Sequence, residues 1–211
     1  MPKSTSKPSK TSENKKNKRD NLFEAADQLF STKGINDTVI DDIVKKAGVA
    51  KGTFYLYFKN KYDIIERLTV RKSMRILKNS MEKLDKYLEE NPIEFSEQIL
   101  MYIDFIIEEL RKDKKTLKLI YKNLSWGFFK KVISEKDVEH SEEVKKILDT
   151  FIDYLDSYGI EEKEAIITLF MIIELTGSIC YSSIILNEPY GIDDMKPYLF
   201  KSIKRILKGD S

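Results

Sequence analysis

The helical spacing of apolar residues constrains this chain more than any other feature of its sequence. From Asn17 to the C-terminus, apolar side chains recur at intervals of three and four residues, and no stretch alternates between apolar and polar residues as a half-buried strand does. The 211 residues include only 8 Gly and 5 Pro, which are too few for the many turns of an all-β protein. The sequence therefore predicts an all-α fold.

The charged residues are divided unevenly along the chain. Residues 1–61 hold 13 Lys and Arg against 7 Asp and Glu, a net charge of +6, whereas residues 62–211 hold 24 against 28, a net charge of −4. A basic module joined to an acidic body is typical of a protein that meets a polyanion with one end. The same charges also fit a solvated Lys-rich tail, so charge alone leaves both interpretations open.

The first 16 residues contain no hydrophobic side chain other than Met1 and prolines, and are rich in Lys, Ser and Thr. Such a segment buries too little apolar surface to offset the entropy of ordering, so we expect a flexible basic arm at 1–16. It lacks the apolar core of a signal peptide, and no run in the chain approaches 18 uninterrupted apolar residues. We therefore expect a cytoplasmic protein without a membrane span.

The chain holds one cysteine, Cys180, and one histidine, His140. A single cysteine cannot form an intrachain disulfide, and a single histidine cannot build a histidine-rich metal site. We expect neither a metal nor a cofactor.

Three short helices are predicted in residues 17–61. The first ends at Gly34, and Thr38 is expected to cap the second, which runs from about Val39 to Ala47 with Asp41 as the acid of its first turn. Gly48 closes that helix, and a very short segment leads to an aromatic cluster at 55–58. Two short helices joined across a glycine turn form a helix-turn-helix.

A long amphipathic helix is expected to open at Lys59 or Asn60 and to end near Asn91-Pro92. Further helical runs are predicted at about 93–112, 114–133 with a break at Gly127, 140–158, 161–187 and 192–208. The predicted organisation is a basic arm (1–16), an N-terminal helix-turn-helix domain (17–61) and a larger helical domain (62–211).

The segment from Leu22 to Ile65 resembles the DNA-binding domain of TetR-family transcriptional regulators, over about 45 of the 211 residues. The matching landmarks are the Ala-Ala pair and the Leu-Phe of the first helix, Gly34, Thr38, Asp42-Ile43, Ala47-Gly48-Val49 and Gly52-Thr53-Phe54-Tyr55-x-Tyr57-Phe58-x-x-Lys61. The resemblance implies a homodimer that binds double-stranded DNA at a pseudo-palindromic operator, and a repressor that responds to a small-molecule effector.

The residue types at 50–57 fit a helix that enters the major groove. The small residues Ala50 and Gly52 let the exposed face of this helix approach the groove closely. Lys51 and Thr53 offer a cation and a hydroxyl to phosphates or base edges. The tyrosines can place hydroxyls against phosphates, and a lysine at the start of the next helix also favours a phosphate. The predicted DNA-binding residues are Thr38, Ala50, Lys51, Gly52, Thr53, Tyr55, Tyr57 and Lys61.

Several of these residues also have a structural interpretation. Tyr55 fits a core ring, Thr38 a helix cap without any DNA contact, and Gly52 a requirement of backbone geometry. Many relatives carry His at the position of Tyr57, which leaves a one-to-one contact at this position open. Phe54 and Phe58 are expected to point inward.

The resemblance places dimerisation in the last two long helices, 161–187 and 192–208. The first of them is apolar almost all round, as expected for a helix between its own core and a partner, although a monomeric core fits the pattern as well. Small residues at three- and four-residue steps could let a second helix approach closely. The predicted interface residues are Leu169, Ile173, Gly177, Cys180, Ile184, Leu199, Ile203 and Ile206.

Aromatic residues are dense in residues 99–133, which favours an aromatic-walled effector cavity, although most of these rings also fit an ordinary core. Glu174 stands among apolar neighbours, and a carboxylate there must be paired, hydrated at an edge, or used, for example by a cationic or polar effector. The candidate ligand-binding residues are Tyr102, Phe105, Tyr121, Trp126, Phe129 and Glu174.

Two other classes of protein compete with a DNA-binding regulator. The chain has no Gly-rich phosphate loop and no Cys/His dyad at workable spacing, and His140 lies in a charged stretch, so the sequence does not predict an enzyme. A helical adaptor that keeps the fold without binding DNA is the remaining alternative. The positive charge of residues 1–61 argues against that alternative.

Overall fold

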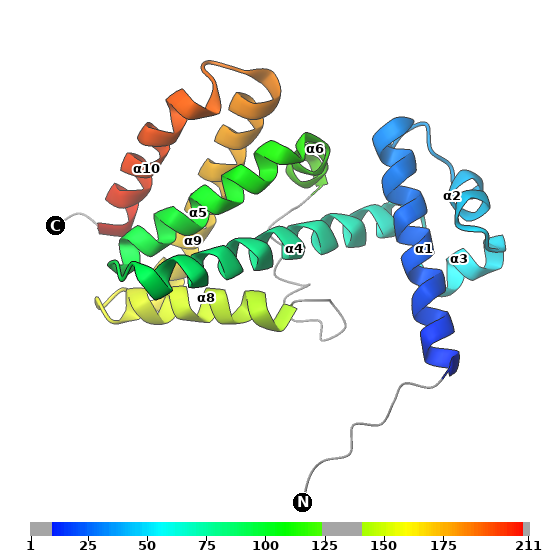
Figure 1. Ribbon diagram of the computed structural model, residues 1–211, viewed down its shortest axis with the longest axis horizontal. Coiled ribbons are helices and arrows are strands. Elements are labelled where there is room, and N and C mark those ends of the chain that lie inside the picture. Colours follow the sequence, from blue (N-terminus) through cyan, green and yellow to red (C-terminus); the bar gives the residue numbers. More distant parts are fainter. Residues whose placement is uncertain (1–9, 124–140, 209–211) are drawn as a thin grey trace, which may run out of the picture. The chain divides into compact units, whose positions relative to one another are not determined.

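The computed structural model describes residues 10–123 and 141–208, and within them the regular secondary structure is entirely helical (Figure 1). The predicted all-α fold is confirmed. The chain divides into two compact units, of which the first ends at Leu68 and the second begins at Thr69. The division therefore falls inside a long helix, seven residues beyond the predicted boundary at 61.

The N-terminal unit contains α1 (Lys10–Thr32), α2 (Ile40–Ala47), α3 (Lys51–Tyr57) and the first turns of α4 (Lys61–Glu90). The ring of Phe58 packs edge-on against that of Phe23 with centroids 5.1 Å apart, and Phe54 lies beside Phe58 at 5.4 Å. These contacts hold the short third helix against α1. The fully or almost fully buried apolar side chains of this unit include Leu22, Ala26, Ile43, Phe54, Phe58, Ile64 and Ile65.

Helix α1 begins at Lys10, seven residues before the predicted start at Asn17. The expectation of a flexible arm over residues 1–16 is therefore wrong for residues 10–16, while residues 1–9 lie outside the described part of the chain. The arm was inferred from missing apolar residues, but Lys and Glu are good helix formers and no proline follows Pro8 in this stretch. A helix that is already nucleated by packing further along can extend through such a stretch.

Glycines and an asparagine set the ends of the helices, largely as predicted. Gly34 (φ 90°) follows the end of α1, and Gly48 (φ 66°) ends α2, so both adopt the left-handed conformation that glycine tolerates. Of the two predicted openings of the long helix, Asn60 is the cap, because its side-chain oxygen accepts the N–H groups of Tyr62 and Asp63 at 2.8 and 3.0 Å.

The second helix begins differently from the prediction. Val39 occupies the capping position, and the carboxylate of Asp42, not Asp41, accepts the Val39 N–H at 3.3 Å. Thr38 is fully buried and its hydroxyl donates to the Gly34 carbonyl at 2.6 Å. Thr38 therefore stabilises the turn between α1 and α2 and does not cap α2.

The C-terminal unit contains the rest of α4, α5 (Phe95–Lys112), α6 (Lys114–Asn123), α8 (Ser141–Asp156), α9 (Glu162–Cys180), the π-helix η1 (Tyr181–Leu186) that continues α9, and α10 (Ile192–Lys208). Helix α5 is attached to α4 by the Lys83–Glu109 ion pair and the Tyr102–Leu77 hydrogen bond, and α8 and α10 both pack against α9 (Figure 1). Its apolar core draws on α4, α5, α6, α8, α9, η1 and α10, with Ile107, Leu117, Leu155, Ala165, Leu199 and Ile203 almost completely buried.

Ion pairs attach α10 to α5. The Lys196 ammonium lies 2.7 Å from Asp104 and 2.9 Å from Glu108, and Arg111 forms a two-pronged contact with Asp193 at 2.9 and 3.0 Å. The bidentate geometry of an arginine and a carboxylate fixes direction as well as distance. These contacts set which face of α10 packs inward and which face is exposed.

Among the described residues, Glu162–Leu186 is a helical stretch that by length and composition could cross a membrane, yet only 22% of its most apolar window is buried. The exposed apolar side chains on this stretch are Ile167, Phe170, Met171 and Leu186. An apolar helix exposed to this degree calls for a further covering surface.

Candidate nucleic-acid interface

The third helix has one face in the core and one face in solvent. Phe54 and Phe58, four residues apart, are 0% and 1% exposed, so they point inward as predicted. The opposite face presents Gly52, Tyr55 and Leu56, of which Tyr55 is 53% and Leu56 79% exposed. A short helix that is anchored by two rings and exposed along its other side has the shape that major-groove binding requires.

Most residues predicted to meet DNA lie on or beside this exposed face. Ala50, Lys51, Gly52 and Tyr55 are exposed, so Tyr55 is not a core ring. Thr53 and Tyr57 are half-buried at its margins. The structure brings these six residues together within α3 and its first flanking residue.

Gly52 does not adopt a left-handed conformation, and a Cβ added to it would meet no heavy atom within 4 Å. The backbone therefore does not require glycine at this position. The other interpretation made from the sequence, close approach of α3 to a groove, is the one that remains for Gly52.

Lys51 is held by α2. Its ammonium lies 2.8 Å from the Asp41 carboxylate, and both side chains are exposed. The hydrogen bond and the charge of Asp41 raise the pKa of Lys51. A phosphate that binds Lys51 must therefore compete with a carboxylate of the same unit.

Two of the eight predicted DNA-binding residues are engaged inside the protein. Thr38 is buried and its hydroxyl is used by Gly34, so we remove it from the DNA-facing set. The Lys61 ammonium donates to the carbonyls of Ile35 and Asn36 at 2.9 and 3.2 Å. Lys61 ties the start of α4 to the loop before α2, which is a structural role that its place at a helix start did not predict.

Two exposed side chains were missed by the sequence reasoning. Leu56 follows directly from the helical spacing, since positions opposite an inward pair at 54 and 58 must face outward. Tyr62 is 69% exposed in the first turn of α4, with the Lys61 ammonium 6.0 Å from its ring centre. Both side chains can add apolar or aromatic contact to a surface that sequence reasoning described as small and polar.

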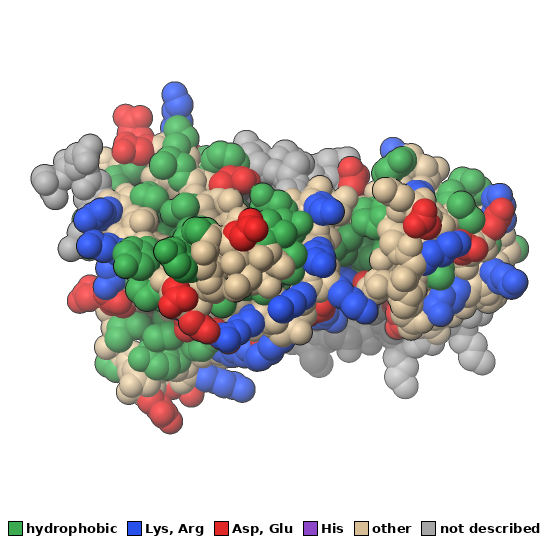
Figure 2. Space-filling model, turned by 90° about the horizontal axis from the view of Figure 1, so that it is seen from above, with side chains coloured by type: hydrophobic (Ala, Val, Ile, Leu, Met, Phe, Trp, Pro, Cys, Tyr) green, Lys and Arg blue, Asp and Glu red, His purple; other side chains and the backbone are tan. Residues whose placement is uncertain are grey.

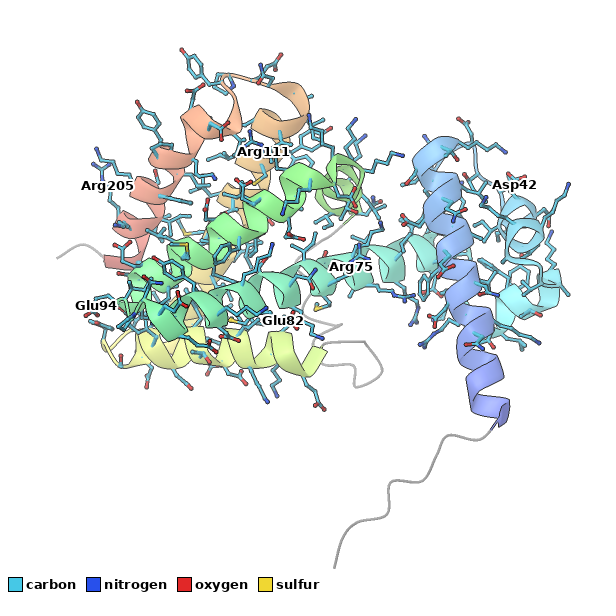
Figure 3. The ribbon with its side chains drawn as sticks, viewed as in Figure 1. Asp42, Arg75, Glu82, Glu94, Arg111 and Arg205 are labelled. Carbon is cyan, nitrogen blue, oxygen red and sulfur yellow. The ribbon has the colours of Figure 1, made fainter. Side chains whose placement is uncertain are left out.

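A charge pair connects the first two helices of the N-terminal unit. Lys33, just after α1, donates to Asp42 at 2.6 Å (Asp42 is labelled in Figure 3). The hydrogen bond from Lys33, and then that from the Val39 N–H, hold the pKa of Asp42 below its usual value. This pair links the end of α1 to the first turn of α2.

No group of three or more metal-ligating side chains is found among the described residues. The surface around α3 offers cations, hydroxyls and small side chains, all of which can serve binding.

Where the structure describes them, the predicted ligand-binding residues lie in different surroundings. Trp126 and Phe129 lie outside the described residues. The Tyr102 hydroxyl donates to the Leu77 carbonyl at 3.1 Å, Phe105 is half-buried, and Tyr121 stacks on Tyr181 with centroids 4.0 Å apart. Glu174 is exposed, so of the alternatives left open by the sequence the structure favours a carboxylate that is hydrated at an edge; the residues directly beside it in sequence point to other sides of α9.

An open cavity of about 570 Å³ lies elsewhere, between the end of α4, α5 and α10. It shares no residue with the predicted ligand set. Its lining includes Tyr87, Ile93, Leu100, Met101, Phe200, Lys201, Lys204 and Arg205.

Half of the predicted dimer-interface residues lie in the chain's own core. Cys180, Ile184, Leu199 and Ile203 are at most 7% exposed within one copy, so they cannot form the outer face of α9 or α10. Leu169 and Ile206 are partly buried against the same core, and Ile173 and Gly177 are half-buried. Because α9 is apolar on all sides, its sequence does not indicate which side points into the core and which points outward.

The comparisons with known proteins agree with this geometry. Residues 22–68 match the family model described as bacterial regulatory proteins, tetR family. The uncharacterized HTH-type transcriptional regulator YdgC of Bacillus subtilis is 32% identical over 114 residues, which cover 53% of this chain and 53% of that protein. The chain spans between a quarter and about half of the length of the curated relatives that it matches first.

Solved structures match over nearly the whole chain. The fatty acid degradation regulator FadR from Bacillus halodurans has a TM-score of 0.57 at 20% identity, covering 94% of this chain and 96% of that one. FadR from Bacillus subtilis in complex with stearoyl-CoA has a TM-score of 0.54 at 19% identity, covering 92% and 100%. At these identities the likeness shows the shared fold.

The N-terminal unit, with its exposed third helix, has the arrangement of a helix-turn-helix domain. As the resemblance of residues 22–65 predicted, it is residues 22–68 that match the tetR family of bacterial regulatory proteins. The relatives found are transcriptional regulators and not enzymes.

Proposed function

We propose that this protein is a ligand-responsive repressor that binds a pseudo-palindromic operator as a homodimer. The observation that carries the proposal is the exposed face of α3, where Lys51, Gly52 and Tyr55 face outward while Phe54 and Phe58 anchor the helix. Helix α3 is short, carries a glycine on its exposed side and is anchored by two buried rings, which is what a recognition helix requires. The net charge of +6 on residues 1–61 supplies attraction to phosphates.

Substitution on the exposed face tests DNA binding. Tyr55→Ala and Lys51→Ala remove side chains without opening the core, so each variant should fold normally and bind operator duplex about tenfold more weakly or worse. Affinity is measured by fluorescence anisotropy at fixed salt, with circular dichroism to check the fold. Unchanged affinity of both variants would overturn the DNA-binding role of α3.

The exposed face of α9 supports the homodimer. Ile167 and Met171 are 47% and 48% exposed, and Phe170 lies between them in sequence with 38% exposed. A second copy that packs on this face and on the outer face of α10 would cover the apolar helix that one copy leaves open. We propose this face, defined by Ile167, Phe170, Met171 and Glu174, as the dimer face of α9.

Buried hydroxyls support an effector site inside the C-terminal unit. The hydroxyl oxygens of Ser80, Thr176 and Ser183 are buried and have no hydrogen-bond partner in the described part of the chain. Buried polar groups are nearly always paired, so each of these positions suits a polar ligand atom or a water molecule. FadR from Bacillus subtilis, which shares the fold, has been crystallised in complex with stearoyl-CoA. A compound screen by thermal shift, followed by operator affinity for each hit, identifies an effector of the present chain.

A regulator of this kind acts where the chromosome is, and we propose a cytoplasmic location.

A helical adaptor without DNA binding is the second candidate. It predicts that wild-type protein binds no duplex at moderate salt, which the anisotropy measurement decides directly.

A further inference from the structure

The open cavity of about 570 Å³ beside α10 is built within the C-terminal unit alone. Its walls come from the end of α4, from α5 and the residue Ile93 before it, and from α10. We call it the α10 cavity. None of its lining residues is among the buried hydroxyls of Ser80, Thr176 and Ser183 that support an effector site. The two are therefore different places in the same unit.

The deeper part of the α10 cavity is apolar. Leu100 is 5% exposed and belongs to the core of the unit, and Phe200 is packed against that core from α10. Ile93 and Met101 are half-buried beside them. Apolar side chains lie next to charged ones on the C-terminal unit, at the left of Figure 2. The cavity has the size of small-molecule sites, about 300–1,000 Å³, and offers carbon surface to the body of a ligand.

The lining carries more positive than negative charge. It contains three cations and two carboxylates, namely Lys201, Lys204, Arg205, Glu97 and Asp104. Both carboxylates form ion pairs, since Glu97 lies 2.5 Å from the Lys204 ammonium and Asp104 lies 2.7 Å from the ammonium of Lys196, a residue outside the lining. Each carboxylate is thus matched by its own lysine, and the charge of Lys201 and Arg205 comes in addition.

Lys201 and Arg205 are neighbours on α10. They are four residues apart, which places them on one face of the helix at successive turns, and both are exposed (Arg205 is labelled in Figure 3). Like charges at this spacing repel each other, and an anion bound between them would relieve that repulsion. An arginine guanidinium also matches the geometry of a carboxylate with two parallel hydrogen bonds.

We infer that the α10 cavity binds an amphipathic anion, a small molecule with an apolar chain or ring that ends in a carboxylate. Its apolar body would lie on Leu100, Met101 and Phe200, and its carboxylate at Lys201 and Arg205. A cationic ligand would meet the surplus of positive charge, and a fully polar one would leave the apolar lining in water. The inference does not rest on DNA binding, because the cavity involves no residue of the N-terminal unit.

Three probes of equal chain length and different head group test the inference. Decanoate, 1-decanol and decyltrimethylammonium are titrated into the full-length protein in a calorimeter. Decanoate should bind one site per chain, at least about tenfold more tightly than 1-decanol, because a hydrogen-bonded charge pair adds to the same apolar contact. Decyltrimethylammonium should bind more weakly than 1-decanol.

Two pairs of substitutions locate the head group. The double variant Lys201→Gln, Arg205→Gln should bind decanoate at least about fivefold more weakly and 1-decanol as wild type does. The control Lys145→Gln, Lys163→Gln removes two exposed lysines of α8 and α9 and should leave both affinities unchanged. Equal affinity of the wild type for decanoate and 1-decanol, or full decanoate affinity in the double variant, would overturn the inference. So would an equal loss of both probes in the double variant.

Two single substitutions locate the apolar body. Met101→Trp adds bulk at a half-buried lining position, so it should weaken decanoate and 1-decanol alike, with circular dichroism to check the fold. Thr176→Val removes a hydroxyl of the proposed effector site and should change neither affinity. Loss of decanoate binding in Thr176→Val but not in Met101→Trp would place the anion in the effector site and overturn the inference. A wild type that gives no binding heat with decanoate overturns it as well, while operator affinity, and with it the proposed function, is measured independently.

Discussion

Asp41 of α2 holds Lys51 of α3 at 2.8 Å across the turn of the helix-turn-helix. The pair places a negative charge at the edge of the surface that is to meet phosphates. Asp41→Asn removes that charge and leaves Lys51 without its competitor, so operator affinity should rise about two- to fivefold at low salt and converge with wild type at high salt. Glu24→Gln, an exposed acid of α1, is the matched control. An Asp41→Asn protein that binds more weakly than wild type would show that the pair orients Lys51 for DNA.

Gly48 and Gly52 should respond in opposite ways to alanine. Gly48 has a φ of 66° and Gly52 has an ordinary helical conformation, and an added Cβ meets no heavy atom at either position. Gly48→Ala should destabilise the N-terminal unit by about 1–2 kcal/mol, whereas Gly52→Ala should stabilise α3 by about 0.5–1 kcal/mol. Urea unfolding measures both effects.

Operator affinity then separates the role of Gly52 from its helix propensity. If α3 approaches the groove closely, Gly52→Ala weakens binding severalfold in spite of the gain in stability. Stability and affinity that rise together would mean that no close approach occurs at Gly52.

The double variant Ile167→Glu, Met171→Glu should dissociate the homodimer. Both side chains are about half exposed in one copy, so the fold should survive while the paired state places four new charges in an apolar interface. Light scattering should give 24.7 kDa for the variant and about twice that for wild type and for the control Lys145→Glu. Because two linked half-sites then become one, operator affinity should fall at least about tenfold. A variant that stays dimeric would place the interface on another surface.

Cys180 should be inert in the native protein at any pH from 7 to about 9. Burial raises the pKa of its thiol to about 12, and because a raised thiol pKa keeps the group protonated, almost no reactive thiolate is present in this range. A thiol reagent should modify native protein at least about 100-fold more slowly than unfolded protein. The Ile167→Glu, Met171→Glu variant should react equally slowly, because Cys180 lies in the core of one copy. Fast reaction in that variant alone would return Cys180 to the subunit interface.

The sequence predicted the helical elements well because apolar spacing determines them. The predicted runs 93–112, 161–187 and 192–208 correspond to α5, α9 with η1, and α10, with ends that differ by one or two residues. The start of α1 at Lys10 could not be predicted, because its first turns contain no apolar residue whose spacing would indicate a helix.

The exposed face of α3 could be predicted from the sequence, because two buried rings determine which side of the helix points inward. In α3, Phe54 and Phe58 settle which residues face outward, and even Leu56 could have been found this way. Residues whose role depends on distant parts of the chain could not be placed. The Thr38 hydroxyl is bound by the Gly34 carbonyl, the Lys61 ammonium is bound by carbonyls of the loop at 35–36, and Glu174 lies on the exposed face of an otherwise apolar helix.

Selection of bound duplexes from a random pool tests the central claim, that α3 of a symmetric pair enters the major groove. The account predicts enrichment of an inverted repeat whose half-sites are centred about one helical turn, or roughly 34 Å, apart, and loss of that enrichment with Tyr55→Ala. A pool that yields no inverted repeat, or a site that Tyr55→Ala binds as tightly as wild type, would contradict it.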